Sequence, residues 1–205
     1  MLITNEDNME LMARYEDNYF DLAIVDPPYG IERFKASDGG NTKKIKSFGD
    51  KNKNWNNIKP NKEFFNELFR VSKYQIIWGS NNFDLPTSEY FIIWQKSNAL
   101  DFSFAMVEQA WTNVKKPAKL YKHLHVHNKD KRIHPTQKPV KLYEWLLMNY
   151  AKQGDKILDT HLGSGSIALA CHNLGYDLTA CELDKDYYDA AIKRIEQHKA
   201  QIRMF

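Results

Sequence analysis

A carboxylate, two prolines and an aromatic ring follow one another at Asp26, Pro27, Pro28 and Tyr29. Consecutive prolines fix φ and remove backbone N–H donors, so this turn is stiff and its carbonyl groups have no helix to join. Asp26 and the Pro27 carbonyl can accept both N–H groups of an exocyclic amine, while Tyr29 stacks on the ring that bears the amine. The block predicts a clamp for a planar, amine-bearing ring. Taken alone, it could also be a proline-rich strand exit with a solvated aspartate.

A second block that can do chemistry comprises Asp159, Gly163, Ser164 and Gly165. Glycines let the backbone approach a ligand closely, and a helix that starts here directs N–H groups and partial positive charge at an anion. Glu182 follows about twenty residues later, where an acidic side chain can accept two ribose hydroxyls. The block therefore predicts a site for a nucleoside that carries an anionic group.

The kind of nucleoside is narrowed by two positions in this block. Ala168 stands where a dinucleotide fingerprint would place its third glycine, although alanine is a permitted variant. Asp159 would repel a pyrophosphate but could hold an ammonium group. A ligand with a ribose, a carboxylate and an amine fits S-adenosylmethionine better than NAD.

Buried strands must position both blocks. The apolar, branched run 21–25 predicts a strand of a parallel sheet with Asp26 at its carboxyl end, where open α/β sheets bind ligands. Residues 156–159 and 177–181 predict two further strands, which end before the glycine block and at Glu182. Strands are also expected at 74–78, 90–94 and 105–114, and the short connections between them indicate an antiparallel element. We therefore expect an α/β fold with a mixed, mostly parallel sheet and helices on both faces.

Five helices are predicted from caps and apolar spacing. The first follows a cap at Thr4 or Asn5, with Glu6 and Asp7 in its first turn. The others are expected at 61–72 with Asn61 as cap, after Thr136 as cap with Pro139 in the first turn, at 167–174 before Gly175, and after the cap Asp184.

Length and composition bound the class of protein. A chain of 205 residues with 27% charged and 42% hydrophobic residues is expected to form one globular domain, residues 1–205. No apolar run is long enough to span a membrane, no signal-peptide pattern is present, and Cys171 and Cys181 form no C-x-x-C pair. We expect a cytoplasmic protein without membrane association.

Positive charge is concentrated in two segments. Residues 31–62 and residues 115–132 each carry a formal charge of +6, although the whole chain carries +3. Residues 31–60 are interpreted as a long, mobile loop and residues 115–133 as a second basic segment, and both predict a polyanion-binding face. Solvated, lysine-rich loops are the alternative. The cations expected to contact the polyanion are Lys43, Lys44, Lys46, Lys115, Lys116, Lys119 and Arg132.

These blocks, together with His134-Pro135-Thr136-Gln137-Lys138-Pro139, resemble the amino-methyltransferases of DNA over nearly the whole chain. The order resembles the permuted group, in which the catalytic motif precedes the cofactor motif. The resemblance implies a Rossmann-like methyltransferase fold that uses S-adenosylmethionine and double-stranded DNA. It implies that Asp26 and Tyr29 act in catalysis, and that the two basic segments contact DNA. The residues implied at the cofactor are Asp7 near its adenine, Lys138 near its carboxylate, and Asp26, Asp159, Gly163, Ser164, Gly165 and Glu182.

This chain departs from the pattern of that family in the glycine block. Thr160 and His161 stand where the family has proline and phenylalanine, and Ser166 replaces threonine. The departures affect the packing beneath the cofactor more than the carboxylate site at the helix start. His161 is expected to pack or to form hydrogen bonds rather than to act as an acid or base.

Several alternatives stay open at this point. D-P-P-Y in this family favours the N6 amine of a flipped adenine, whereas N4-cytosine enzymes more often carry serine first. A protein-glutamine methyltransferase and an inactive DNA-binding regulator are weaker alternatives, because Asp26 and Tyr29 are intact. His123, His125 and His127 alternate, as a metal site or a DNA-facing cationic edge would; we expect no metal. A homodimer is plausible, and neither the recognition sequence nor a cognate nuclease follows from the sequence.

Overall fold

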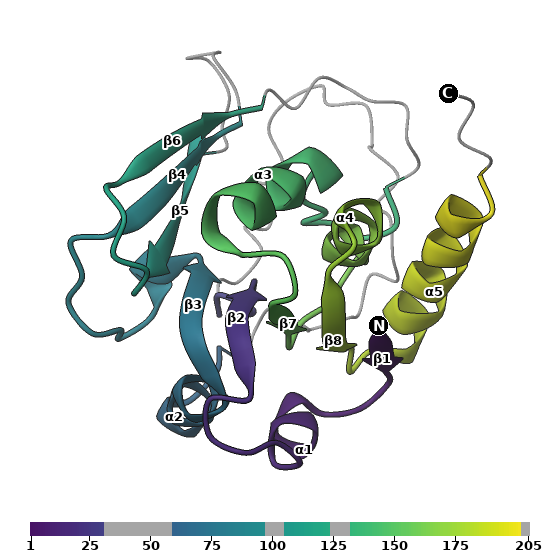
Figure 1. Ribbon diagram of the computed structural model, residues 1–205, viewed down its shortest axis with the longest axis horizontal. Helices are drawn as coiled ribbons and strands as arrows, with labels where there is room; N and C mark the ends of the chain where they lie inside the picture. The colour runs from purple at the N-terminus through teal and green to yellow at the C-terminus, as the bar shows by residue number, and fades with distance from the viewer. Residues whose placement is uncertain (31–58, 97–104, 124–131, 202–205) are drawn as a thin grey trace, which may run out of the picture.

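One mixed sheet of eight strands forms the centre of the computed structural model, which describes residues 1–30, 59–96, 105–123 and 132–201 (Figure 1). The strand order is β1-β8-β7-β2-β3-β5-β4-β6. The strands are β1 (Leu2–Thr4), β2 (Phe20–Val25), β3 (Ser72–Trp78), β4 (Phe91–Gln95), β5 (Val107–Thr112), β6 (Lys119–Lys122), β7 (Lys156–Asp159) and β8 (Asp177–Cys181).

The first five strands of this order are parallel, and only β5 runs against its neighbours β3 and β4. The predicted mostly parallel sheet with an antiparallel element is therefore confirmed. Two strands were not predicted: β1 pairs with β8, and β6 pairs in parallel with β4.

Helices cover both faces of the sheet, as expected (Figure 1). The helices are α1 (Asn8–Met12), α2 (Lys62–Val71), α3 (Val140–Tyr150), α4 (Ser166–Leu174) and α5 (Lys185–Lys199). Side chains of β2 alternate between the faces, because successive residues of a strand point to opposite sides. Leu22 and Ile24 pack with α3 and α4, whereas Ala23 and Val25 pack with α1 and α2. Both faces of β2 are thus buried, which explains its continuous apolar run.

Two predicted helix starts were wrong. Residues 2–4 are drawn into the sheet, so α1 begins at Asn8 and its cap is Asp7, whose carboxylate accepts from the Met9 N–H at 2.8 Å. Pro139, not Thr136, is the N-cap of α3, because the hydroxyl of Thr136 lies 3.1 Å from Nδ1 of His134. The predicted caps Asn61 and Asp184 are confirmed by their hydrogen bonds to the first turns of α2 and α5.

Strand direction decides which residues share an edge. The parallel strands β2, β3, β4 and β6 end at the same edge, and the antiparallel strand β5 begins there. We call this the carboxyl edge; it holds Asp26, Gly79, Lys96, Glu108 and His123. Within the described part of the chain, no helix has the length and apolar character needed to cross a membrane.

Candidate active site

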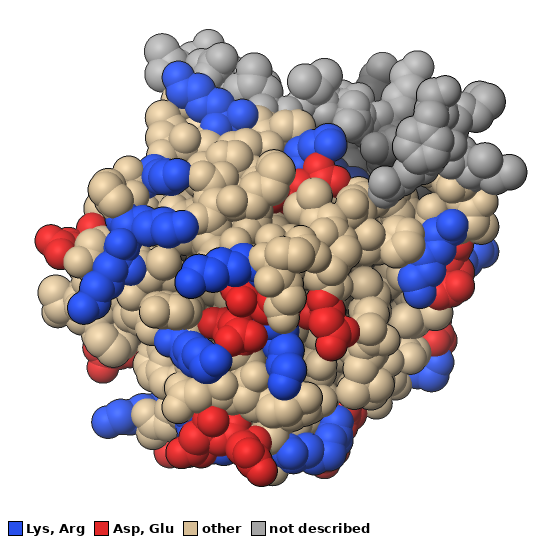
Figure 2. Space-filling model, viewed as in Figure 1, with Lys and Arg blue, Asp and Glu red and all other residues tan. Residues whose placement is uncertain are grey.

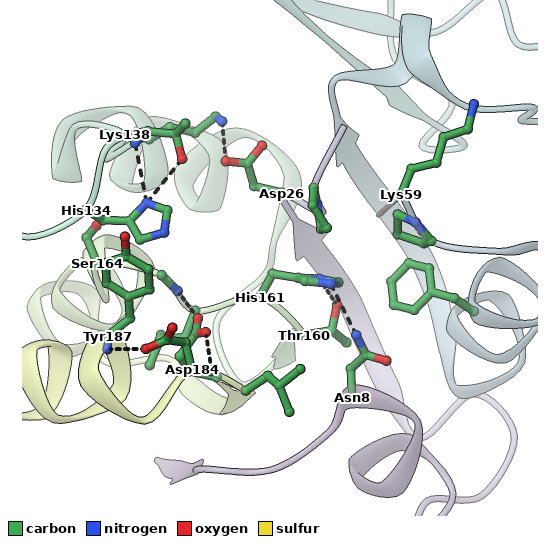
Figure 3. Close-up of a pocket in the computed structure, with 18 of the residues that line it drawn as sticks. Asn8, Asp26, Lys59, His134, Lys138, Thr160, His161, Ser164, Asp184 and Tyr187 are labelled. Atoms are coloured by element: carbon green, nitrogen blue, oxygen red, sulfur yellow. Dashed lines mark hydrogen bonds and ion pairs between the residues drawn. The ribbon is translucent and has the colours of Figure 1, made fainter. Parts of the chain in front are cut away.

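A pocket of about 650 Å³ opens at the carboxyl edge, between the ends of β2 and β7 (Figure 3). Here the connections of the sheet turn in opposite directions, since β7 leads through α4 to β8 while β2 leads to α2 and β3. Asp26 and Pro28 line one side, and Gly163, Ser164 and Glu182 line the other. The pocket therefore joins the proline block to the glycine block.

The register of the sheet places the two blocks side by side. Leu22 of β2 pairs with Ile157 of β7, and Ala23 pairs with Leu158. Because these strands are parallel neighbours, the turns that follow them leave the sheet at adjacent positions. The predicted adjacency of Asp26 and the glycine turn is confirmed.

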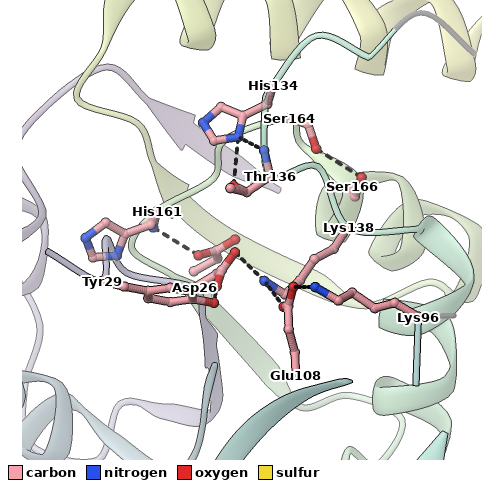
Figure 4. A network of polar contacts seen from close by, with 11 residues as sticks. Asp26, Tyr29, Lys96, Glu108, His134, Thr136, Lys138, His161, Ser164 and Ser166 are labelled. Carbon is pink, nitrogen blue, oxygen red and sulfur yellow. Dashed lines mark hydrogen bonds and ion pairs between the residues drawn. The ribbon is translucent and has the colours of Figure 1, made fainter. Parts of the chain in front are cut away.

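Both oxygens of the Asp26 carboxylate have partners (Figure 4). The hydroxyl of Tyr29 donates to Oδ1 at 2.6 Å, and Nζ of Lys138 donates to Oδ2 at 2.5 Å. The Lys138 ammonium, whose side chain is 3% exposed, also pairs with Oε2 of Glu108 at 3.1 Å. Burial lowers the pKa of Lys138, but the two carboxylates outweigh burial and raise it above its usual value. Lys138 is therefore a charged partner of Asp26.

Sequence reasoning assigned Lys138 to the cofactor's carboxylate and gave Glu108 no role. The structure places the ammonium between Asp26 and Glu108, and Lys96 extends the chain of charges by donating to Oε1 of Glu108 at 2.8 Å. Lys138 lies just before α3 and Glu108 lies on β5, so no local sequence spacing connects either residue with Asp26. A charged residue at the start of a half-buried strand was the one available signal.

Tyr29 is held by Gly79 at the end of β3. A Cβ atom on Gly79 would lie 2.1 Å from Cε1 of Tyr29, and φ of Gly79 is +69°. The ring meets Phe83 edge-on at 6.1 Å, and burial, followed by the negative charge of Asp26, raises the pKa of Tyr29 well above its usual value. Tyr29 is thus a neutral donor to Asp26; its stacking on a base stays a prediction.

The glycine turn is tied to β8 and α5. The Gly163 N–H donates to Oε2 of Glu182 at 2.8 Å, and the Asp184 N–H donates to Oε1 at 3.0 Å. Burial raises the pKa of Glu182 above its usual value. Arg194 of α5 donates to the Ser164 carbonyl at 2.8 Å and so fixes the turn from behind.

Gly165 serves helix packing rather than the pocket wall. Its φ is +72°, and a Cβ atom there would lie 3.2 Å from Cδ1 of Ile195 and 3.4 Å from Cβ of Ala191. The absence of a side chain lets α4 approach α5 closely. Packing against α5 therefore explains why a glycine is needed here, and the contact of Gly165 with a cofactor stays a prediction.

Two titratable groups lie at the carboxyl end of β7, where His161 lines the pocket. Asp159 is 2% exposed, and burial raises its pKa to about 8, although its Oδ1 accepts from the His161 N–H at 3.0 Å. Burial lowers the pKa of His161 to about 3, so this ring is neutral. Its Nε2 lies 3.1 Å from the amide nitrogen of Asn8 and its Nδ1 lies 2.9 Å from the Thr160 hydroxyl. His161 forms hydrogen bonds, as the sequence indicated.

Asp159→Asn is expected to stabilise the ligand-free chain at high pH. The pKa of Asp159 in the folded chain lies above the usual 3.8, so the folded state binds more protons and the free energy of unfolding falls between pH 4 and about 8. The asparagine should add ~1–3 kcal/mol at pH 8.5 and little at pH 4. Urea unfolding at both pH values measures this, and an equal difference at each would refute it.

Asp7, which is expected near a cofactor adenine, caps α1. Its neighbours Glu6, Asn8 and Met9 line the pocket. A contact between Asp7 and the cofactor's adenine stays a prediction. The direction of this segment is fixed by the three-residue strand β1, which was not predicted.

The predicted DNA contacts fall into three groups. Lys43, Lys44 and Lys46 lie outside the described residues. Lys116 and Lys119 donate to the carbonyl and side chain of Asn149 at the end of α3, on the edge opposite the pocket, and Lys115 precedes them. Arg132 is two residues from His134, which lines the pocket. Of these cations, only Arg132 is described near the pocket.

Over the lower half of the face in Figure 2, Lys and Arg alternate with Asp and Glu instead of forming one basic patch. Lys59, which no motif indicated, lines the pocket.

The described residues contain no group of three His, Cys, Asp or Glu that could hold a metal ion. His123 stacks on Tyr121 at 6.1 Å, and His125 and His127 lie outside the described residues.

Comparison with known proteins adds to this geometry. Residues 50–193 of this chain match the sequence model of a protein family described as DNA methylase. Type II methyltransferase M2.DpnII of Streptococcus pneumoniae is 25% identical over 96% of this chain and 90% of that protein. Type II methyltransferase M.HpaI of Haemophilus parainfluenzae is 34% identical, but over only 37% of this chain and 24% of that protein.

Solved structures share the fold. The M1.HpyAVI–SAM complex matches with a TM-score of 0.61 and 22% identity, over 94% of this chain and 98% of that one. PvuII DNA methyltransferase, described as cytosine-N4-specific, matches with a TM-score of 0.62 and 12% identity, over 96% and 89%. At these identities the similarity establishes the Rossmann-like methyltransferase architecture.

Proposed function

Because the chain belongs to the DNA methylase family and its cofactor is S-adenosylmethionine, we propose that it methylates the exocyclic N6 amine of adenine in double-stranded DNA. The observation that carries this proposal is the adjacency of Asp26 and the glycine turn across one pocket. An amine held by the first would face a methyl group held near the second.

The residues that line the pocket fit S-adenosylmethionine. A volume of about 650 Å³ lies within the range of pockets that enclose small ligands. Glu182 can accept from ribose hydroxyls, the turn at Gly163 and Ser164 can receive the carboxylate, and Asp159 beneath it can balance the ammonium. Met9 and Phe64 give the pocket apolar walls for an adenine ring. When bound, the cofactor supplies an electrophilic methyl group on a sulfonium.

Asp26 and the Pro27 carbonyl prepare the nucleophile. The lone pair of an exocyclic amine is delocalised into its ring, which makes the amine a poor nucleophile. Two acceptors for its N–H groups favour a pyramidal nitrogen whose lone pair points out of the ring plane. Orientation for in-line displacement can supply roughly 7 to 11 kcal/mol. The nitrogen loses its proton only after methylation makes it acidic.

The base must leave the duplex to reach Asp26, because the carboxylate lies within the pocket. Tyr29 is proposed as its stacking partner, and Lys59 at the pocket lining as a cation on the approach to the phosphates. We also propose that residues 1–205 form one methyltransferase domain, since the described strands share one sheet.

Cytosine N4 is the second candidate for the target. Both bases present an amine beside a ring nitrogen, and a structure described as cytosine-N4-specific shares the fold. The first residue of the proline block is aspartate, which favours adenine in the resemblance described above. We therefore give preference to adenine.

Sequencing DNA from cells that express the chain, with a readout that distinguishes modified adenine from modified cytosine, tests the proposal. We expect N6-methyladenine in one fixed sequence context and none in cells that express Asp26→Ala at the same level. N4-methylcytosine would select the second candidate, and unmodified DNA from cells with folded, wild-type protein would refute both.

A further inference from the structure

Glu108, at the start of β5, stands outside every sequence motif and yet completes the charge network around Asp26 (Figure 4). Its Oε1 accepts from Lys96 at 2.8 Å and its Oε2 lies 3.1 Å from Nζ of Lys138. Nζ of Lys138 donates to Asp26 at 2.5 Å. Along these contacts the charged groups alternate in sign, from Lys96 through Glu108 and Lys138 to Asp26, and their formal charges sum to zero.

This balance matters because Lys138 is shielded from water. Removing an ammonium from water costs free energy unless carboxylates pair with it. Nζ of Lys138 also lies over the ring of Trp78, 5.3 Å from the ring centroid. Oε2 of Glu108 is itself shielded from solvent. Lys138 thus has two countercharges, Asp26 and Glu108, and its pairing with one carboxylate weakens its pairing with the other.

Asp26 has a conflicting task in the proposed reaction. It must accept from an incoming amine, but Tyr29 and Lys138 already donate to its two oxygens. An ammonium paired with Asp26 alone would neutralise the carboxylate and weaken it as an acceptor. A second carboxylate on the far side of the ammonium limits this loss.

We propose that Glu108 is a positioning residue of the methyl transfer, which shares the Lys138 ammonium with Asp26 and so keeps Asp26 available as an anionic acceptor for the substrate amine. This inference rests on the proposed function. Lys96 supports Glu108 by balancing its second oxygen.

Glu108→Gln tests the proposal, because it removes the charge and keeps the shape. We expect kcat at pH 7.5 to fall about 30-fold, the order expected when a charged hydrogen bond to a reacting group weakens. KM for S-adenosylmethionine should stay within about twofold, because Glu108 does not line the pocket. The measurement is transfer of labelled methyl groups to DNA at saturating substrate.

The pH profile separates this role from a merely structural one. Loss of one countercharge lowers the pKa of Lys138, so raising the pH removes the competing proton earlier in the variant than in the wild type. The ratio of variant to wild-type kcat should therefore rise between pH 7 and pH 9.5. The double variant Glu108→Gln/Lys138→Met should also have a higher kcat than Glu108→Gln alone, because the competing ammonium is gone.

Glu144→Gln is the matched control. Glu144 is also buried and pairs with a lysine, Lys141, and it accepts from Asn173, but it lies on α3 away from Asp26. Its kcat should stay within about twofold even if stability falls. Glu108→Asp retains the charge and should keep more activity than Glu108→Gln.

A Glu108→Gln variant with wild-type kcat and a parallel pH profile would overturn the inference while leaving the proposed function intact. Should that variant fail to fold by circular dichroism, Glu108→Asp decides: near-normal kcat supports the inference, and inactivity of the folded Asp variant overturns it. An inactive wild-type protein would instead refute the proposed function.

Discussion

Replacing Asp26 with alanine should lower the rate of methyl transfer by about 1,000-fold or more, while the affinity for S-adenosylmethionine changes by only a few-fold. Among the described residues that follow β2, Asp26 supplies the side-chain carboxylate that lines the pocket shared with the glycine turn. Its loss removes the group that orients the amine, and losing one such group typically costs 10² to 10⁴ in rate. Cofactor affinity should persist because Gly163, Ser164 and Glu182 are unchanged.

Asp21→Ala is the control for this variant. Asp21 lies on the same strand, but at its opposite end, where it pairs with Lys73 at 2.7 Å. Its loss can reduce stability but should leave the rate within about twofold. Rates come from single-turnover transfer and affinities from calorimetry. An Asp26→Ala protein within tenfold of the wild-type rate would contradict the role given to this carboxylate.

Gly79→Ala should be the second most damaging change, lowering the rate by about 100-fold. The added Cβ would stand 2.1 Å from Cε1 of Tyr29, so the ring must move and its 2.6 Å hydrogen bond to Asp26 must break. Displacing a catalytic group by about an ångström can cost 10²-fold. Because φ is +69°, an alanine here is also strained, and this strain should lower the free energy of unfolding by about 1–2 kcal/mol.

Gly154→Ala separates the clash from the strain. Gly154 has a φ of +92°, but no atom lies within 4 Å of where its Cβ would stand. Both variants should lose stability, measured by urea unfolding, whereas only Gly79→Ala should lose activity at a temperature where both are folded. Equal activities would show that the position of Tyr29 does not depend on Gly79.

The parts of the fold that could be predicted are those whose signal is local. Asn61 and Asp184 identify helix starts because a side-chain oxygen and the first turn lie within three residues. The strand before Asp26 is recognisable because both of its faces are buried and the four residues that precede Asp26, Leu22 to Val25, are all apolar. β1 could not be recognised, because three residues show no period and its pairing with β8 spans the chain.

The contacts of the site were harder to predict because they join distant segments. Lys138 and Asp26 are 112 residues apart, and Glu108 reaches them only because β5 runs antiparallel beside β3. The direction of β6 likewise decides that Lys119 lies on the edge away from the pocket. Composition identified a basic segment but could not give its direction in the sheet.

Gly79 and Gly165 show the same limit. Gly79 directly follows the strand predicted at 74–78, and the sequence marked Gly165 as part of a ligand loop; the structure shows a close approach to Tyr29 at the first and to α5 at the second. A glycine indicates that some group comes close. Which group it is depends on the tertiary packing.

The crystal structure of the chain with S-adenosylmethionine bound is the most direct test of the central claim, that amine and methyl donor meet between β2 and β7. We predict the ribose at Glu182, the carboxylate at the turn of Gly163 and Ser164, and the methyl group directed toward Asp26. A cofactor bound outside this pocket, or with its methyl group directed away from Asp26, would contradict the account.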